Sequence, residues 1–354
     1  MIKIVTIVGA RPQFIKAAAV SREFSNHSNI EEVIIHTGQH FDANMSDVFF
    51  DELKIPKPHY NLSINSLGHG AMTGRMLESI EEVLLKEKPD WVMVYGDTNS
   101  TIAGALAAKK LHIRVAHVEA GLRSFNIRMP EEVNRILTDR ISDVLFCPTE
   151  EAIKNLEKEG FENLDCSIVK NGDVMQDAAL FYKDASKKPK ADFPDNFILV
   201  TLHRAENTDD LSRLKAIIDS LNTIHQQTPV VWLIHPRTKK ILQKENIKVD
   251  FLIFDPIGYL EMIYMLQNCK MVMTDSGGLQ KEAFFFKKNC ITLRDETEWV
   301  ELIENGFNIV VGADPKKIED AYSKMIEKEN DFDINLYGNG LASKVIAQKL
   351  LNEY

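Results

Sequence analysis

The sequence predicts an α/β protein built from two Rossmann-like, doubly wound domains. Short apolar runs that are rich in β-branched residues alternate with helical stretches along the whole chain. This alternation is typical of βαβ units, and nearly continuous apolar strands indicate a parallel sheet covered on both faces. The length of 354 residues favours two domains over one.

The order of the expected elements places a boundary near the middle of the chain. Helices are expected over residues 71–87 and 100–110, and a polar linker with two prolines, "DASKKPKADFPD", covers residues 184–195. We therefore predict domains at residues 1–183 and 196–339, with a last helix over residues 340–354 that completes either domain. The strand-like runs on the two sides of the linker are "KIVTIVG", "EEVIIHTG", "DWVMVYG", "RVAHVEA" and "DVLFCPT", then "NFILVTLHR", "VVWLIHPR", "FLIFDPIG", "KMVMTDSGG" and "NCITLRD".

Composition and charge narrow the function classes. Hydrophobic residues make up 44% and charged residues 27%, which is typical of a globular protein with a sizeable core. A net charge of −10 argues against a general nucleic-acid binder, although a local pocket for a small anion remains compatible with it. The four cysteines have no CxxC spacing and are interpreted as core thiols. The short apolar N-terminus shows no cleavage pattern and no spanning length, so we expect a cytoplasmic protein without a membrane partner.

Polar residues of the types that bind ligands or catalyse reactions cluster directly after the predicted strands. Because ligands of doubly wound sheets bind beyond the carboxyl ends of the strands, we expect these residues to face a cleft between the two domains. They are Arg11, Lys16, Gln39, His40, Asp97, Glu119, His203, Arg204, His235, Arg237 and Asp275, and the helix that opens at "PEEVNR" adds Glu131, Glu132 and Arg135.

The stretch "TDSGGLQKEA" predicts an anion site. Gly277 and Gly278 allow close approach of a ligand to the backbone, and the helix that follows offers free N–H groups with a positive dipole end. Glu282 is placed to accept hydrogen bonds from ribose hydroxyls. The alternative is an ordinary strand–helix turn with Ser276 as N-cap and Glu282 in solvent. Neither GxGxxG nor GxxxxGK[ST] spacing occurs, so neither a dinucleotide fingerprint nor a P-loop is supported.

Three carboxylates, Asp97, Glu119 and Glu131, are candidates for proton transfer. Acids that share one cleft shift each other's pKa values, which suits proton abstraction and return. The alternative is that Asp97 and Glu131 only stabilise helix N-termini. Among the histidines after strands, His203 is the functional candidate, and His117 and His235 are interpreted as core or loop histidines. No HxH or HExxH spacing occurs, so a metal site is not expected.

The ordered motifs of the chain resemble the non-hydrolysing UDP-N-acetylglucosamine 2-epimerases over essentially its whole length. The resemblance implies a glycosyltransferase-B-type fold, an isomerase that acts at C2 of a UDP-N-acetylhexosamine, a homodimer, no cofactor and no metal, and a role in supplying precursors of surface polysaccharides. The motifs are "IVGARPQFIK", "TGQH", "YGDTNST", "HVEAGLRS", "PEEVNRILTD", "NGDVMQDA", "HRAEN", "HPR" and "TDSGGLQKEA".

The resemblance also implies a mechanism and residue roles. A base removes the C2 proton while UDP leaves C1, which gives a 2-acetamidoglucal, and UDP then adds back with a proton on the other face. Asp97, Glu119 and Glu131 match the acid–base set, with the order of their roles open, and His203 matches a histidine near the diphosphate. The positions that match substrate-binding residues are Arg11, Lys16, Arg135, Ser276, Gly277, Gly278 and Glu282.

Two segments depart from the better-known members and leave the sugar open. Trp299 and Val300 stand where those members have Arg and Pro, and "ETEWVE" is similar to the branch that epimerises UDP-2,3-diacetamido-2,3-dideoxy-glucuronate. Arg128, in "RSFNIRMPEE", is a candidate to face a sugar carboxylate, with a solvated loop arginine as the alternative.

Regulation and other enzyme classes also remain open at this point. Gln39 and His40 lie in a region that forms a second, activating UDP-GlcNAc site in some bacterial members, which makes them candidates for an allosteric site. A hydrolysing epimerase, a glycosyltransferase of the same fold and a non-catalytic nucleotide-sugar sensor are the competing functions.

Overall fold

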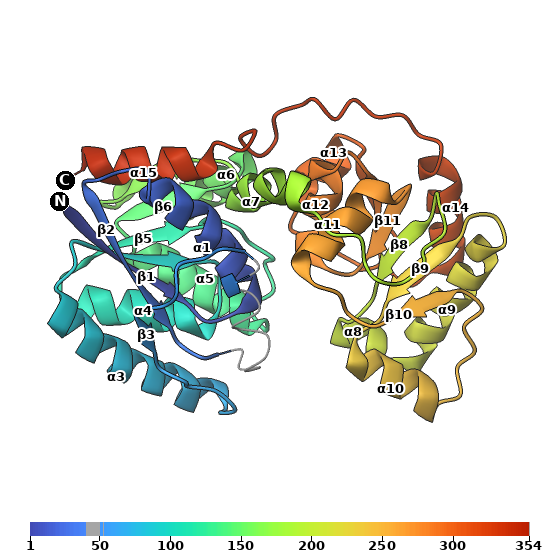
Figure 1. Cartoon of the computed structure of the whole chain (residues 1–354), viewed down its shortest axis with the longest axis horizontal. Helices are drawn as coiled ribbons and strands as arrows, with labels where there is room; N and C mark the ends of the chain where they lie inside the picture. The colour runs from blue at the N-terminus through green and yellow to red at the C-terminus, as the bar shows by residue number, and fades with distance from the viewer. Residues whose placement is uncertain (40–49, 52, 354) are drawn as a thin grey trace. The chain divides into compact units, whose positions relative to one another are not determined.

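The computed structural model describes residues 1–39, 50–51 and 53–353. The chain divides into two compact units (Figure 1). The N-terminal unit comprises Met1–Ala178 and Asn335–Tyr354, and the C-terminal unit comprises Ala179–Ile334. Both contain an all-parallel sheet flanked by helices, which confirms the predicted α/β class with two Rossmann-like folds.

The sheet of the N-terminal unit has, within the described residues, seven strands in the order β3-β2-β1-β4-β5-β6-β7. Each apolar run predicted in this half forms a strand, and two further strands, β3 and β7, extend the edges. The strands are β1 (Ile2–Val8), β2 (Ile30–His36), β3 (Tyr60–Asn61), β4 (Trp91–Tyr95), β5 (Arg114–Val118), β6 (Val144–Cys147) and β7 (Ser167–Lys170).

The helices of the N-terminal unit cover this sheet. They are α1 (Arg11–Phe24), α3 (His69–Glu87), α4 (Asn99–Lys110), α5 (Pro130–Ile141), α6 (Glu150–Lys158), the short η1 (Phe161–Asn163), α7 (Val174–Tyr182), which continues into the other unit, and α15 (Ala342–Asn352). The C-terminal helix α15 packs against α1 and so completes this unit. Asp177 holds its start, because the carboxylate accepts hydrogen bonds from the backbone N–H groups of Ala342 (3.1 Å) and Ser343 (2.7 Å).

The C-terminal unit repeats the design with six described strands in the order β10-β9-β8-β11-β12-β13. The strands are β8 (Ile198–Thr201), β9 (Val230–Leu233), β10 (Leu252–Phe254), β11 (Met271–Thr274), β12 (Asn289–Thr292) and β13 (Asn308–Val310). The helices are η2 (Lys183–Ala185), α8 (Ala205–Thr208), α9 (Leu211–His225), α10 (Pro236–Lys244), α11 (Tyr259–Asn268), α12 (Gly277–Phe285), α13 (Val300–Glu304) and α14 (Pro315–Met325).

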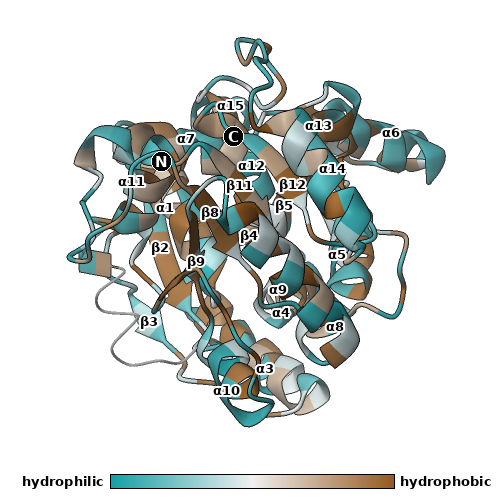
Figure 2. Cartoon of the chain, turned by 90° about the vertical axis from the view of Figure 1, so that its right-hand side faces the viewer, coloured by the Kyte–Doolittle hydropathy of each residue, from teal (hydrophilic) through white to brown (hydrophobic). Residues whose placement is uncertain are grey.

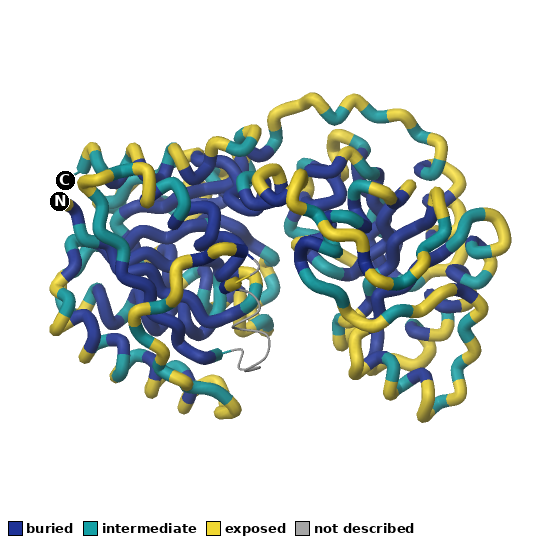
Figure 3. Tube along the Cα trace, in the orientation of Figure 1, coloured by how far each residue is buried: buried dark blue, intermediate teal, exposed yellow. Residues whose placement is uncertain are grey.

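Apolar side chains of the central strands form the core of each unit. The strands are mostly brown in the hydropathy view (Figure 2) and dark blue in the burial view (Figure 3). In the N-terminal unit, Ile7 and Val94 pack with Met76 of α3, and in the C-terminal unit Val200 and Trp232 pack with α9. Within the described residues, no helix combines the length and the apolar character needed to cross a bilayer.

Strand order places one switch point in each sheet. Chain connections run outward in opposite directions from the adjacent strands β1 and β4, and likewise from β8 and β11. Loops that diverge at such a point leave a crevice beyond the carboxyl ends of the strands. The predicted residues Arg11 and Asp97 follow β1 and β4, while His203 and Asp275 follow β8 and β11.

Candidate active site

In the N-terminal unit, the switch point carries a cavity of about 190 Å³. Lys16 of α1, Asp97 after β4 and Glu131 of α5 line it, so three predicted residues from separate segments meet at one place. Gln39 also lines this cavity, and its Oε1 accepts hydrogen bonds from the Ser100 N–H (3.0 Å) and hydroxyl (2.8 Å) at the start of α4.

Arg135 holds Asp97 in place. The buried guanidinium forms ion pairs with Asp97 and with Glu132 of its own helix. Burial works to lower the pKa of Arg135, but the carboxylates of Asp97 and Glu132 outweigh this effect and raise it. The Asn134 side-chain amide donates to the Asp97 carbonyl (3.0 Å), so α5 fixes both the backbone and the side chain of Asp97.

Glu119 lies directly after β5 in a strained backbone conformation. Its φ is +73°, in the left-handed region that is costly for residues other than glycine and that occurs often at functional sites. The Lys16 ammonium forms an ion pair with the Glu119 carboxylate, and the Glu119 N–H donates to the Phe146 carbonyl (3.1 Å). Lys16 therefore links Glu119 to the cavity that Asp97 and Glu131 line.

Glu131 differs from the other two acids in its surroundings. It is exposed at the first turn of α5, and within the described part of the chain it makes no ion pair. Asp97 and Glu119, in contrast, each contact a cation. The three carboxylates therefore have distinct electrostatic environments, which is a prerequisite for distinct acid and base roles.

In the C-terminal unit, the fully buried Asp275 organises the loop after β8. Its carboxylate accepts from the backbone N–H groups of His203 (3.0 Å) and Arg204 (2.9 Å) and from the Asn207 side chain (3.3 Å). Asp275, which precedes the Ser-Gly-Gly turn, thus binds groups of the protein itself and fixes the position of His203.

His203 is the more accessible member of this pair. Its side chain is 42% exposed, and its Nδ1 lies 3.2 Å from Asp275 Oδ1. Partial burial lowers the pKa of His203; Asp275 opposes this, whereas Arg204 and His235 contribute to the lowering. The lowered pKa favours the neutral form of the ring.

The first turn of α12 offers uncapped N–H groups. Ser276 occupies the N-cap position, but its side chain makes no capping hydrogen bond, contrary to the ordinary-turn alternative. A Cβ at Gly277 would lie 2.3 Å from Glu298 Oε1, so a larger residue at this position would displace the end of the Glu298 side chain. Glu282 is 8% exposed on the same helix and is thus not a solvated acid.

Trp299 also contacts this turn. Its indole Nε1–H donates to the Gly277 carbonyl (2.9 Å), and the Lys281 Nζ lies 4.0 Å from the centroid of its ring. Because the side chain is 3% exposed, Trp299 belongs to the packing beneath the turn. The residue therefore contacts the predicted nucleotide site, and its role in sugar specificity stays a prediction.

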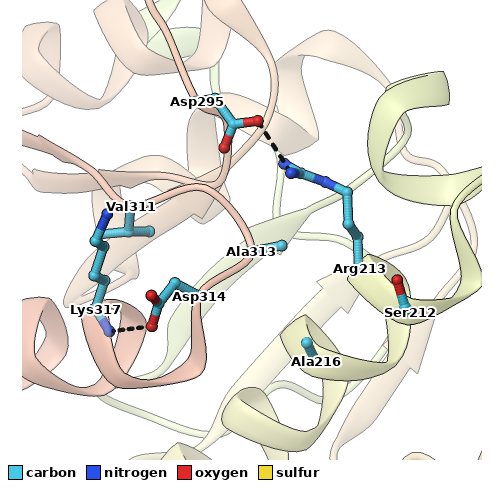
Figure 4. A pocket seen from close by; sticks show the side chains of 8 residues that line it. All are labelled: Ser212, Arg213, Ala216, Asp295, Val311, Ala313, Asp314 and Lys317. Atoms are coloured by element: carbon cyan, nitrogen blue, oxygen red, sulfur yellow. Dashed lines mark hydrogen bonds and ion pairs between the residues drawn. The ribbon is translucent and has the colours of Figure 1, made fainter.

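A separate cavity of about 330 Å³ opens beside α9 and α14 (Figure 4). The side chains of Arg213 and Asp295 meet across its rim at 3.0 Å, while Asp314 caps α14 by accepting from the Lys317 N–H (3.1 Å). None of the residues predicted for the site lines this cavity, so it stands apart from the candidate active site.

Comparisons with known proteins bear on the family. The model of the UDP-N-acetylglucosamine 2-epimerase family matches residues 22–351. The UDP-2,3-diacetamido-2,3-dideoxy-D-glucuronate 2-epimerase of Pseudomonas aeruginosa is 57% identical over 350 residues, which cover 98% of this chain and 99% of that protein. The chain belongs to the UDP-N-acetylglucosamine 2-epimerase family.

Solved structures agree with this assignment. A crystal structure of Methanocaldococcus jannaschii UDP-GlcNAc 2-epimerase in complex with UDP-GlcNAc and UDP has a TM-score of 0.90 and 44% identity, covering 99% of this chain and all of that one. The Neisseria meningitidis UDP-GlcNAc 2-epimerase bound to UDP-GlcNAc has a TM-score of 0.89 and 31% identity, with the same coverage. The family resemblance seen in the sequence motifs is thus confirmed.

Two residues that support the site in this epimerase-family chain were not predicted from the sequence. Gln13 is buried, accepts from the Gly9 and Ala10 N–H groups and donates to the Tyr95 carbonyl (2.7 Å), so it ties the loop after β1 to the end of β4. Its place in "ARPQF" was the available signal. Lys281 gave no signal in the sequence, because its burial and its contact with the Trp299 ring are tertiary features.

Three other predicted residues of this epimerase-family chain lie outside the contacts given above, and a fourth is not described by the structure. Arg11 is half-buried at the start of α1, whereas Arg128 is exposed in the loop before α5. His235 caps α10 by accepting from the Arg237 N–H (3.3 Å), which agrees with its interpretation as a loop histidine. His40 lies outside the described residues.

Proposed function

We propose that this protein interconverts the gluco and manno isomers of a UDP-linked 2-acetamido sugar by inversion at C2. The observation that carries the proposal is the meeting of Asp97, Glu131 and the Lys16–Glu119 pair at one switch point. Carboxylates with unlike surroundings can take up and return a C2 proton, as the reaction requires. Family membership supports the same reaction class.

The proposed substrate is UDP-2,3-diacetamido-2,3-dideoxy-glucuronate. The relative at 57% identity carries that name, whereas the Methanocaldococcus jannaschii UDP-N-acetylglucosamine 2-epimerase is 45% identical. The exposed Arg128 near Glu131 would contribute a cation for the sugar carboxylate. UDP-GlcNAc, the leading substrate from the motifs alone, is the second candidate, because most of the relatives bear its name.

In the proposed reaction, the N-terminal unit handles the protons. A carboxylate removes the proton from C2, the C1–O bond breaks with its electron pair leaving on UDP, and a C1–C2 double bond forms. A second acid then returns a proton to the opposite face of C2 while the UDP oxygen re-forms the bond to C1. Arg135 and Lys16 keep Asp97 and Glu119 oriented throughout.

The C-terminal unit is proposed to retain UDP between the two half-reactions. The uncapped N–H groups at the start of α12 and the His203 side chain would bind the diphosphate, and Glu282 would accept from the ribose hydroxyls. Arg11 is assigned to the nucleotide sugar by its match with the family. The reaction leaves no free UDP and needs no redox step.

Two-substrate NMR tests the proposal. Purified protein is incubated separately with UDP-2,3-diacetamido-glucuronate and with UDP-GlcNAc, and the anomeric and C2 proton signals are followed. We expect the manno isomer to accumulate from the acidic diacetamido sugar. Turnover of UDP-GlcNAc alone would reverse the order of the two substrates, and turnover of neither would refute the proposed function.

The same assay separates the competing enzyme classes. Free sugar with stoichiometric UDP would identify a hydrolysing epimerase, and a requirement for an acceptor would identify a glycosyltransferase. Binding of UDP-sugar without any conversion would identify a sensor. We also propose a cytoplasmic location and a homodimer. Light scattering of the purified chain measures the oligomeric state directly.

A further inference from the structure

Trp299 makes a specific hydrogen bond to the first residue of α12. The indole Nε1–H donates to the Gly277 carbonyl at 2.9 Å, and the side chain is buried at 3% exposure. The bond joins residues 22 positions apart and lies wholly inside the C-terminal unit. A buried hydrogen bond of this kind stabilises the peptide orientation that it engages.

Orientation of this peptide matters because its two polar groups point in opposite directions. The peptide unit between Gly277 and Gly278 is planar and trans, so a carbonyl held toward Trp299 turns the Gly278 N–H the other way. Gly278 is also uncrowded, because a Cβ built on it would meet no atom within 4 Å. α12 begins at Gly277, so its helical geometry sets the direction of this peptide. Two consecutive glycines make the first turn easy to distort, and the Trp299 bond adds a contact from outside the helix that holds it.

The same indole ring contacts a buried cation. Lys281 Nζ lies 4.0 Å from the ring centroid, and Lys281 is 2% exposed, one turn into α12. Attraction between an ammonium and an indole face is strongest where both are desolvated. A positive charge at this depth adds to the dipole at the helix N-terminus.

Neighbouring contacts attach the Trp299 segment firmly to α12. The Trp299 N–H donates to Thr297 Oγ1 (3.2 Å), and the Thr297 hydroxyl donates to Gln280 Oε1 (2.7 Å). Asn308 Nδ2 also donates to Gln280 Oε1 (3.0 Å). The indole is therefore anchored on the helix that it orients.

We propose that Trp299 is a positioning residue of the nucleotide site, which aims the Gly278 N–H at the diphosphate and holds the Lys281 ammonium beneath the turn. This inference rests on the proposed function, because it takes UDP as the ligand of α12. It assigns to Trp299 a role in nucleotide affinity that is distinct from contact with the sugar.

Trp299→Phe tests the inference, because it removes the Nε1–H donor and keeps an aromatic face for Lys281. We expect the Kd for UDP, measured by calorimetry, to rise about fivefold, which corresponds to one neutral hydrogen bond. The KM for the UDP-sugar should rise with it, while kcat changes less than twofold. Trp299→Leu removes the ring face as well and should weaken UDP binding further.

Trp232→Phe is the matched control. Trp232 is fully buried in the core of the same unit, and its Nε1 has no hydrogen-bond partner in the described structure. This variant should lose stability and keep the wild-type Kd for UDP. Equal loss of affinity in both variants, or wild-type affinity in Trp299→Phe, would overturn the inference.

The wild-type protein provides a readout that does not depend on the folding of a variant. The chain has three tryptophans, and the Nε1 groups of Trp91 and Trp232 lack partners in the described structure. We expect the hydrogen-bonded indole N–H of Trp299 alone to shift during a UDP titration followed by ¹H–¹⁵N NMR. An unmoved Trp299 signal in protein that binds UDP contradicts the inference alone, whereas protein that binds no UDP contradicts the proposed function as well.

Discussion

His117 Nε2 lies 2.7 Å from the Gly96 carbonyl oxygen, and both residues are buried beneath the Asp97 loop. The carbonyl can only accept, so Nε2 carries a proton, while Nδ1 lies 2.7 Å from the Asp139 carboxylate. Burial works to raise the pKa of Asp139, but His117 and Arg123 outweigh it and lower that pKa. The carboxylate is thus ionised, and the His117 ring, held between Asp139 and the Gly96 carbonyl, secures the peptide that precedes Asp97.

Replacement of His117 should affect catalysis more than nucleotide binding. We expect His117→Leu to lower kcat at least tenfold, because the Gly96–Asp97 peptide loses its anchor, and to leave the Kd for UDP within twofold. His117→Gln keeps a donor for the carbonyl and should recover part of the activity. Equal kcat values in the two variants would show that the hydrogen bond to Gly96 has no positioning role.

The acid–base assignment predicts variants that bind but do not turn over. Asp97→Asn and Glu119→Gln should each keep UDP affinity, because UDP is assigned to the C-terminal unit, and should lower kcat by 100-fold or more, as expected for loss of a general acid or base. Calorimetry with UDP and the NMR conversion assay measure the two quantities. Full activity of both variants would remove these carboxylates from the mechanism.

Glu282 is predicted to contribute affinity through the ribose. A hydrogen bond to a charged group contributes about 1.5–3 kcal/mol, so the wild type should bind UDP roughly tenfold or more tightly than 2′-deoxy-UDP. Glu282→Gln should shrink this ratio severalfold. The four Kd values, for two proteins and two nucleotides, form a double-mutant cycle. An unchanged ratio would show that Glu282 does not bind the ribose hydroxyl.

The raised pKa of Glu32 predicts a pH dependence of protein stability that does not involve the proposed function. The residue keeps some exposure, but burial raises the pKa of its carboxyl from 4.5 to about 7, although a hydrogen bond from Thr6 (2.5 Å) opposes the shift. The folded state therefore binds more protons than the unfolded state between about pH 4.5 and 7, and stability falls as the pH rises through this window.

Glu32→Gln tests this linkage, because the amide cannot ionise. Above pH 7 the variant should be more stable than the wild type by about 1–3 kcal/mol, and near pH 4.5 the two should converge. Urea unfolding at several pH values gives the difference. A constant difference across the range would show that Glu32 titrates normally in the folded state.

The sequence predicted most of the sheet architecture because the signal for buried parallel strands is local. All ten apolar runs formed strands, but β3, β7 and β13 were missed. β3 has two residues, and β7 and β13 are short and only half-buried, so their composition does not distinguish them from loops. Their positions depend on neighbouring strands and not on their own sequences.

The candidate site was predictable where residues follow strands and unpredictable where contacts are tertiary. Asp97 and Lys16 meet at one switch point, as the α/β topology requires. In contrast, the bond from Trp299 to Gly277 depends on side-chain packing between distant segments, which no local pattern encodes. Gln13 was overlooked for the same reason, because its partner Tyr95 is 82 residues away.

Solvent exchange at C2 tests the central claim most directly. The protein is incubated with UDP-2,3-diacetamido-glucuronate in D₂O, and the epimeric UDP-sugars are examined by ¹H NMR and mass spectrometry. Proton abstraction by a carboxylate and return from the opposite side predict a manno product that carries deuterium at C2, with UDP still attached. A manno product that retains the original C2 proton, or release of free sugar in place of the epimer, would contradict the account.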